Sequence, residues 1–86
     1  MKIKRNIALS DTGFVFDPST GDSFSTNPIG LEIIRMLKQD KSREEIKATI
    51  LNTYMIDDAG FEKDYYDFVN MLLKLKLVEN NGKEEN

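Results

Sequence analysis

The sequence contains no cysteine and no histidine among its 86 residues. Without cysteine there are no disulfides, thiol nucleophiles or thiolate metal sites. Without histidine, both the Ser/His/Asp and Cys/His catalytic arrangements lack their base. The five glycines are scattered rather than gathered in a phosphate-binding loop. We therefore expect no enzymatic activity and no cofactor.

A dense cluster of metal ligands is also absent from the sequence. Asp57 and Asp58 are adjacent in a loop, but the glycine and terminal glutamate spacing of a calcium loop is missing. Helix capping is the expected role of this pair, and we expect no metal site.

Long hydrophobic runs are absent as well. No stretch approaches the roughly 20 apolar residues that a membrane span requires. Residues 1–6 include three basic side chains, but the apolar stretch of a signal peptide does not follow them. We expect a cytoplasmic protein with no membrane contact.

The composition fits one small domain with a core. Hydrophobic residues make up 40% of the chain, and the net charge is −3. Acidic and basic residues are interspersed, whereas nucleic-acid binders usually carry a basic stripe. We assign one domain to residues 1–78 and a disordered polar tail to residues 79–86, where nothing can be buried.

The first part of the chain has the pattern of a small sheet. Short apolar alternations separated by Gly- and Pro-containing turns predict strands at residues 3–9, 14–16 and 22–26. In the last strand, Phe24 is expected to point inward and Ser23 and Ser25 outward. A three-stranded antiparallel meander of this size must lie on other elements to be stable.

Three helices are predicted to follow the sheet. The first begins at Pro28 behind a Thr26 or Asn27 cap, the second behind the capping box Ser42-Arg43-Glu44-Glu45, and the third spans residues 58–77. Gly30 inside the first helix costs roughly 1 kcal/mol relative to alanine. We expect close packing against the third strand or another helix to compensate for it. The fold class is therefore α+β, with a winged-helix-like order of elements.

The third helix is the most informative element of the sequence. At about 100° per residue, its side chains fall into an apolar arc, a polar face and an intermediate shoulder. The arc contains Phe61, Tyr65, Phe68, Val69, Leu72 and Leu75; the polar face contains Lys63, Asp67, Asn70 and Lys74; the shoulder contains Tyr66, Leu73 and Leu77. The shoulder either covers loops or forms one wall of a groove for a partner.

Two binding functions are compatible with this order of elements. A winged helix-turn-helix DNA-binding protein would present Lys63, Lys74 and Lys76 to phosphates, although Asp64 and Asp67 share that helix. The alternative is peptide capture by strand addition at the edge of the last strand, beside the helix shoulder.

Three stretches of the chain resemble the PqqD-like family. Residues 24–37, with Asn27-Pro28 and then Gly30 before an aliphatic helix, resemble its strand-to-helix junction. Residues 42–46 are similar to its second-helix start, and residues 68–78 resemble its closing amphipathic helix. The resemblance spans about residues 3–78. Two departures are Ile34, near a position where the family often has tryptophan, and Asp40, where it usually has glycine.

The resemblance implies a recognition element for ribosomally made, modified peptides. Such a domain binds the leader segment of a precursor peptide and presents it to a modifying enzyme, often a radical SAM protein. The leader would add to the third strand and pack on the third helix. The positively charged Lys63, Lys74 and Lys76 beside this groove would favour acidic leaders. The predicted peptide-binding residues are Ser23, Phe24, Ser25, Thr26, Lys63, Tyr65, Tyr66, Val69, Leu73 and Lys74.

Overall fold

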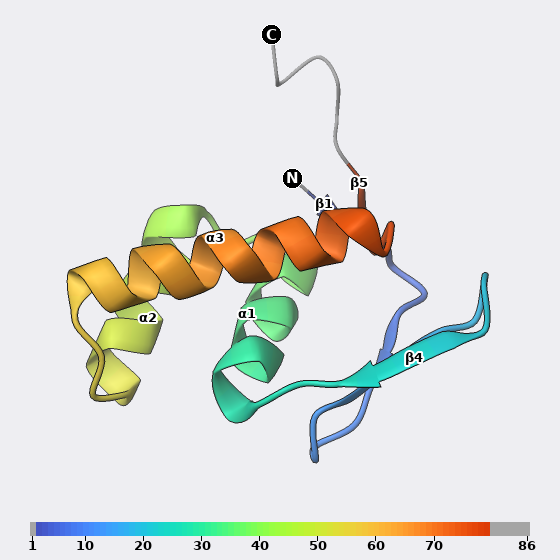
Figure 1. Ribbon diagram of the computed structural model, residues 1–86, viewed down its shortest axis with the longest axis horizontal. Coiled ribbons are helices and arrows are strands. Elements are labelled where there is room, and N and C mark those ends of the chain that lie inside the picture. Colours follow the sequence, from blue (N-terminus) through green and yellow to red (C-terminus); the bar gives the residue numbers. More distant parts are fainter. Residues whose placement is uncertain (1, 80–86) are drawn as a thin grey trace, which may run out of the picture.

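The computed structural model describes residues 2–79 (Figure 1). The elements are, in order, β1 (Lys2–Ile3), β2 (Ala8–Leu9), β3 (Phe14–Asp17), β4 (Asp22–Ser25), α1 (Pro28–Lys38), α2 (Arg43–Thr53), α3 (Asp58–Lys74) and β5 (Val78–Glu79). The predicted order of a meander followed by three helices is confirmed. Residues 80–86 of the predicted tail lie outside the described range. Glu79, also assigned to the tail, instead pairs with Lys2.

The meander has the strand order β2-β3-β4, with antiparallel pairing throughout. Val15 lies opposite Phe24, and both point toward the core, where Val15 is fully buried and Phe24 half-buried. Ser23 and Ser25 are exposed on the outer face, as the alternation predicts. They share that face with Phe14 and Phe16, which are 47% and 37% exposed.

The prediction of a single strand at residues 3–9 is wrong. The segment forms two short strands, because Lys2 and Ile3 pair with β5 whereas Ala8 and Leu9 pair with β3. Lys4 donates its backbone N–H to the Leu77 carbonyl at 2.9 Å before the chain turns. This pairing joins the two ends of the domain, so no local pattern in the sequence could reveal it.

Each helix begins with a side-chain cap. Asn27 Oδ1 accepts from the Gly30 N–H at 2.8 Å at the start of α1. Ser42 and Glu45 form the predicted capping box of α2, with bonds of 2.8 and 3.1 Å. Asp57 Oδ1 caps α3 by accepting from the Gly60 N–H at 2.7 Å. These caps satisfy backbone donors that the first helical turn leaves free.

Two helix ends use a left-handed residue. Asp40, after α1, has φ 61°, in the left-handed region that glycine adopts more readily than other residues at a helix C-terminus. At the end of α3, Lys76 has φ 59°, and the Leu77 N–H bonds back to the Leu72 carbonyl at 2.9 Å. The chain therefore leaves the helix at Lys74 rather than at the predicted residue 77.

The core lies between α3, the other two helices and the inner face of the meander. From α3 it takes Phe61, Tyr65, Val69 and Leu72. Leu77, which the sequence placed on the shoulder, is only 2% exposed and belongs to this core. Within residues 2–79, no helix is both long and apolar enough to cross a membrane.

Candidate functional site

The strand β4 forms one open edge of the meander. Its neighbour on the other side is β3, and the Thr26 N–H continues that ladder by donating to the Gly13 carbonyl at 2.8 Å. In an antiparallel pair, alternate residues direct both N–H and C=O toward the partner strand. Given the register, Phe24 and Thr26 therefore face β3, while the backbone groups of Ser23 and Ser25 point to the open edge.

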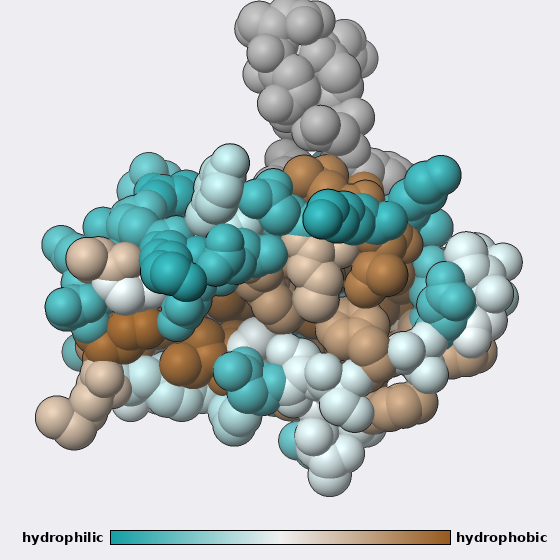
Figure 2. All heavy atoms as spheres, in the orientation of Figure 1, coloured by the Kyte–Doolittle hydropathy of each residue, from teal (hydrophilic) through white to brown (hydrophobic). Residues whose placement is uncertain are grey.

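The helix α3 passes beside this edge, and an apolar band lies between them. Figure 1 shows α3 above β4 and the start of α1, and Figure 2 shows hydrophobic side chains filling the trough between the polar outer surface of α3 and the elements below it. We call this trough the β4–α3 groove. It contains two pockets, one near each end of β4.

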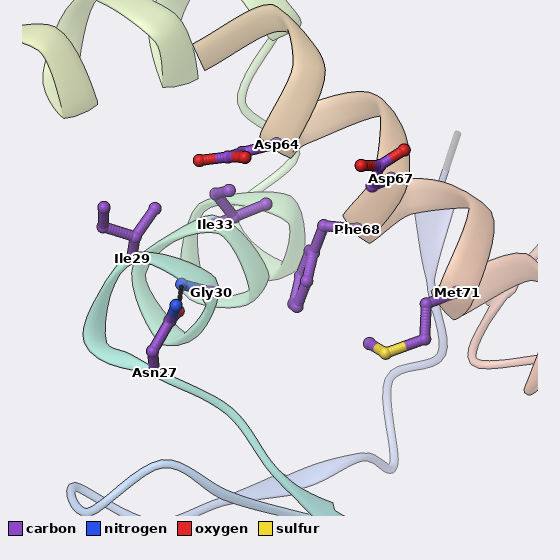
Figure 3. Close-up of a pocket in the computed structure, with 8 residues that line it drawn as sticks. All are labelled: Asn27, Ile29, Gly30, Ile33, Asp64, Asp67, Phe68 and Met71. Carbon is purple, nitrogen blue, oxygen red and sulfur yellow. Dashed lines mark hydrogen bonds between the residues drawn. The ribbon is translucent and has the colours of Figure 1, made fainter. Parts of the chain in front are cut away.

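The first pocket has a volume of about 340 Å³ and lies between α1 and α3, just beyond the end of β4 (Figure 3). Its lining residues are Asn27, Ile29, Gly30, Ile33, Asp64, Asp67, Phe68 and Met71. The side chains of Phe68 and Met71 project from α3 toward α1, and the two aspartates lie at the rim. An extended chain that continues along β4 past Ser25 would run across this pocket.

The second pocket has a volume of about 190 Å³ and lies at the beginning of β4. Its lining residues are Val15, Asp17, Asp22, Ser23, Phe24, Leu75 and Leu77. Leu75 is 37% exposed directly after α3, so it is available to a side chain that enters the groove.

Gly30 controls how closely Phe68 approaches α1. A Cβ atom at Gly30 would overlap Thr26 Oγ1 and lie only 2.9 Å from Phe68 Cε1. The prediction that close packing compensates for this glycine is therefore confirmed. The missing side chain allows the Phe68 ring to form the floor of the first pocket.

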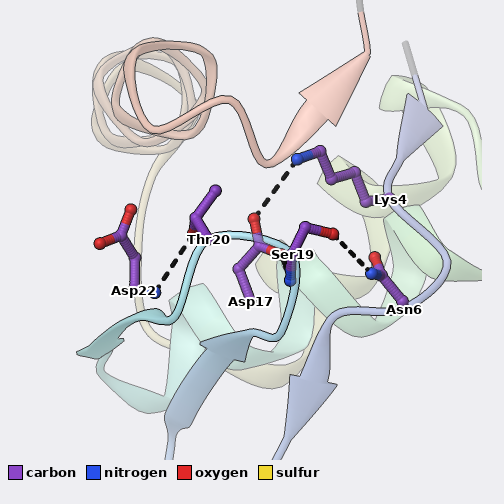
Figure 4. Close-up of polar contacts among 6 residues, drawn as sticks. All are labelled: Lys4, Asn6, Asp17, Ser19, Thr20 and Asp22. Atoms are coloured by element: carbon purple, nitrogen blue, oxygen red, sulfur yellow. Dashed lines mark hydrogen bonds and ion pairs between the residues drawn. The ribbon is translucent and has the colours of Figure 1, made fainter.

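A buried carboxylate supports the β3–β4 turn beneath the second pocket (Figure 4). Asp17 is 1% exposed; it accepts the Ser19 N–H at 2.9 Å and pairs with Lys4 Nζ at 3.3 Å. Burial raises the pKa of Asp17, but the Ser19 N–H and the Lys4 ammonium outweigh this effect and hold the pKa below its usual value. Asp17 is therefore charged when the turn is formed, and it links the turn to the N-terminal segment.

The groove has a negative electrostatic character. Every charged residue that lines either pocket is an aspartate: Asp17, Asp22, Asp64 and Asp67. Lys4 neutralises Asp17, and Lys63 pairs with Asp67 at 3.2 Å on the exposed surface. No metal-binding cluster of acidic side chains occurs within the described range.

Comparisons with known proteins agree with this geometry. The family model described as "Coenzyme PQQ synthesis protein D (PqqD)" matches residues 12–78. The chain belongs to the PqqD family. The solved structure "TbiB1 in Complex with the TbiA(beta) Leader Peptide" is similar to this chain, with 30% identity and a TM-score of 0.82; the match covers 93% of this chain and 96% of the other. No curated protein matches significantly.

In this PqqD-family domain, most of the predicted site residues fall into two groups. One group lies along β4 beside the groove, and the other lies on the side of α3 that faces α2. Ser23 and Phe24 line the groove, and Ser25 and Thr26 continue the same strand toward α1. Lys63, Tyr65, Tyr66 and Val69 instead line a separate hollow of about 440 Å³ beside α2, together with Arg43 and Glu62. Leu73 packs partly against the core, and Lys74 is exposed at the end of α3.

The separate hollow beside α2 has its own contacts. The Arg43 guanidinium lies 5.6 Å from the Tyr65 ring centroid and pairs with Glu62. Burial raises the pKa of Tyr65, opposed by the nearby charge of Arg43. Tyr66 is 68% exposed. None of these side chains lines the pockets beside β4.

The groove-lining residues Met71, Asp64 and Asp67 were not among the predicted site residues, and Phe68 and Leu75 were placed only in the apolar arc of the third helix. A signal for them existed. Phe68, Met71 and Leu75 form an i, i+3, i+7 stripe that helical geometry places on one side of α3.

Proposed function

We propose that this PqqD-family domain binds the leader segment of a ribosomally made precursor peptide as an added strand along β4. The observation that carries the proposal is the open edge at Ser23 and Ser25, which lies beside an apolar wall. Main-chain hydrogen bonds would provide affinity, and pockets for alternate side chains would provide specificity. The similarity to TbiB1, whose structure contains a leader peptide, supports the same ligand class.

The two pockets suggest the spacing of the leader side chains that bind them. The first pocket is centred near Phe68, and the second adjoins Leu75 and Leu77. Leu75 follows Phe68 by seven residues, which is about 10 Å along α3 at about 1.5 Å of rise per helical residue. An extended peptide advances about 3.3 Å per residue, and only every second side chain faces the helix. Two apolar leader side chains four residues apart therefore fit the groove.

The rest of the proposal concerns the partner and the reaction. We propose that the domain is a non-catalytic presenter, and that a modifying enzyme of the radical SAM class acts on the bound precursor. A cytoplasmic location stays a prediction. The aspartates that line the groove do not suit a phosphate backbone, so DNA binding is not proposed.

An NMR titration tests the binding mode. The ligand is a peptide that the protein selects from a phage-displayed library of random 12-residue peptides, added to the ¹⁵N-labelled protein. We expect the amide signals of residues 23–26 and of residues 64–75 on the groove side of α3 to shift together. Shifts confined to Arg43, Tyr66 and their neighbours would instead place the ligand in the hollow beside α2 and contradict the proposal.

A pair of variants separates main-chain from side-chain recognition. Ser25→Pro removes an N–H that points to the open edge, a position where edge strands tolerate proline. Ser25→Ala keeps that N–H and removes only the hydroxyl. We expect Ser25→Pro to remove most of the binding and Ser25→Ala to bind like the wild type. Equal binding by the two variants would show that the edge does not pair with the ligand.

A further inference from the structure

Two aspartates, Asp64 and Asp67, lie at the rim of the first pocket. Asp64 takes part in none of the ion pairs formed between the described residues. Among the described residues, Asp67 forms an ion pair only with the exposed Lys63, whose Nζ lies 3.2 Å from Asp67 Oδ2. In Figure 3 the Asp67 carboxylate lies above Phe68 and Met71, and the Asp64 carboxylate lies above Ile33. A peptide that crosses the pocket therefore passes two carboxylates with little compensating charge.

The other polar element at this pocket offers little to an acidic peptide. The first turn of α1 would normally present free N–H groups to an anion. Here Asn27 Oδ1 already accepts from the Gly30 N–H, and Pro28 has no N–H. Lys63 lines the hollow beside α2 rather than the groove. No lysine or arginine lines either pocket.

We infer that the leader carries a lysine or arginine beside the apolar side chain that enters the first pocket, and that Asp64 and Asp67 select it. This inference rests on the proposed function. A long cationic side chain can lay its aliphatic part over Phe68 and Met71 while its charged end reaches the rim. The charge preference is opposite to the acidic leaders expected from the lysines of α3. It makes Asp64 and Asp67 specificity-determining residues.

Selection from a phage-displayed library of random 12-residue peptides tests the inference without a known leader. The folded 86-residue chain is the bait, in three forms: wild type, the double variant Asp64→Asn/Asp67→Asn, and the control Glu44→Gln. Glu44 is an exposed carboxylate in the first turn of α2, away from the groove. We expect wild type and control to enrich Lys or Arg at one position next to an apolar residue. The double variant should lose that enrichment.

The affinities of one selected peptide and of its Lys→Gln form are then measured on the wild type and on the double variant. Together they give the coupling energy between the peptide lysine and the two aspartates. On the wild type, the substitution should weaken Kd by about 3- to 5-fold, as for an exposed ion pair at the upper end of the usual range. On the double variant it should change Kd less than about twofold. The difference should shrink as salt is raised, because exposed charges are screened.

The outcomes separate the inference from the proposed function. Enrichment of Asp or Glu, or no charge preference, among peptides that need the β4 edge would overturn the inference alone. Peptides that bind Ser25→Pro and Leu75→Glu as tightly as wild type would overturn the proposed groove and the inference with it. Failure to select any peptide would count against both. Leu75→Glu serves as a second probe should Ser25→Pro not fold, because Leu75 is already 37% exposed.

Discussion

Replacing Gly30 with alanine should narrow the first pocket while leaving the protein folded. The added methyl carbon would lie 2.9 and 3.1 Å from Phe68 Cε1 and Cζ. Carbon atoms at optimal contact are about 3.5–4.0 Å apart, so the ring must move by roughly half an ångström or more. The Thr26 hydroxyl, which the methyl would also overlap, can rotate about χ1. The Phe68 ring has less freedom, and its retreat takes space from the pocket of about 340 Å³.

Two opposing energies set the stability of this variant. Alanine gains up to about 1 kcal/mol of helix propensity over glycine, and overpacking costs about 1–3 kcal/mol. We expect a net loss of about 0–2 kcal/mol in the free energy of unfolding. A domain of this size has roughly 4–13 kcal/mol in total. Peptide binding should weaken by about fivefold, which corresponds to roughly 1 kcal/mol.

Urea denaturation followed by circular dichroism and peptide binding followed by fluorescence anisotropy measure the two effects. Gly60→Ala is the matched control, because the atoms nearest to its added Cβ belong to Asp57 and Ile56, neither of which lines either pocket. It should affect stability and leave peptide affinity unchanged. If Gly30→Ala gained the full helix propensity and kept wild-type affinity, Phe68 would not be the floor of a peptide-binding pocket.

Three further predictions test the core, the turn and the ligand class. Leu72→Ala should lower the free energy of unfolding by about 2–5 kcal/mol, since Leu72 is 0% exposed, whereas Tyr66→Ala should change it by less than about 0.5 kcal/mol; similar losses in urea melts would contradict the core assignment. The pKa of Asp17 is lower in the folded than in the unfolded state, so its stabilisation is complete above the unfolded pKa and is lost as pH falls through the folded pKa. Urea midpoints measured below pH 5 should fall less steeply for Asp17→Asn than for wild type, and parallel curves would refute this role. Duplex DNA at low salt should bind no tighter than the nonspecific range of roughly 10⁻⁴–10⁻⁶ M; tight binding with a steep salt dependence would favour the winged-helix alternative.

Local signals in the sequence were sufficient for much of the fold. The Ser42/Glu45 capping box, the Asn27-Pro28 helix start and the Gly30 packing site each act over a few residues. The alternation around Phe24 likewise identified the edge strand and its faces. Each of these features depends on short-range chemistry that neighbouring residues specify directly.

The flank of α3 that faces β4 could not be predicted in the same way. A helical pattern shows which residues share a side, but not which neighbouring element that side meets. Phe68 and Val69 are consecutive in the sequence and both belong to the apolar arc, but their side chains project about 100° apart around the helix. Phe68 lines the groove and Val69 the hollow beside α2. The pairing of β1 with β5 was missed for a related reason, since it joins Lys2 to Glu79 across nearly the whole domain.

Amide hydrogen exchange at β4 tests strand addition most directly. The Phe24 amide faces β3 in the free protein, whereas the Ser23 and Ser25 amides point to the open edge. Saturating peptide should therefore slow exchange at Ser23 and Ser25 strongly and change Phe24 little. If Ser23 and Ser25 exchange at the same rate with and without bound peptide, the peptide does not pair with β4.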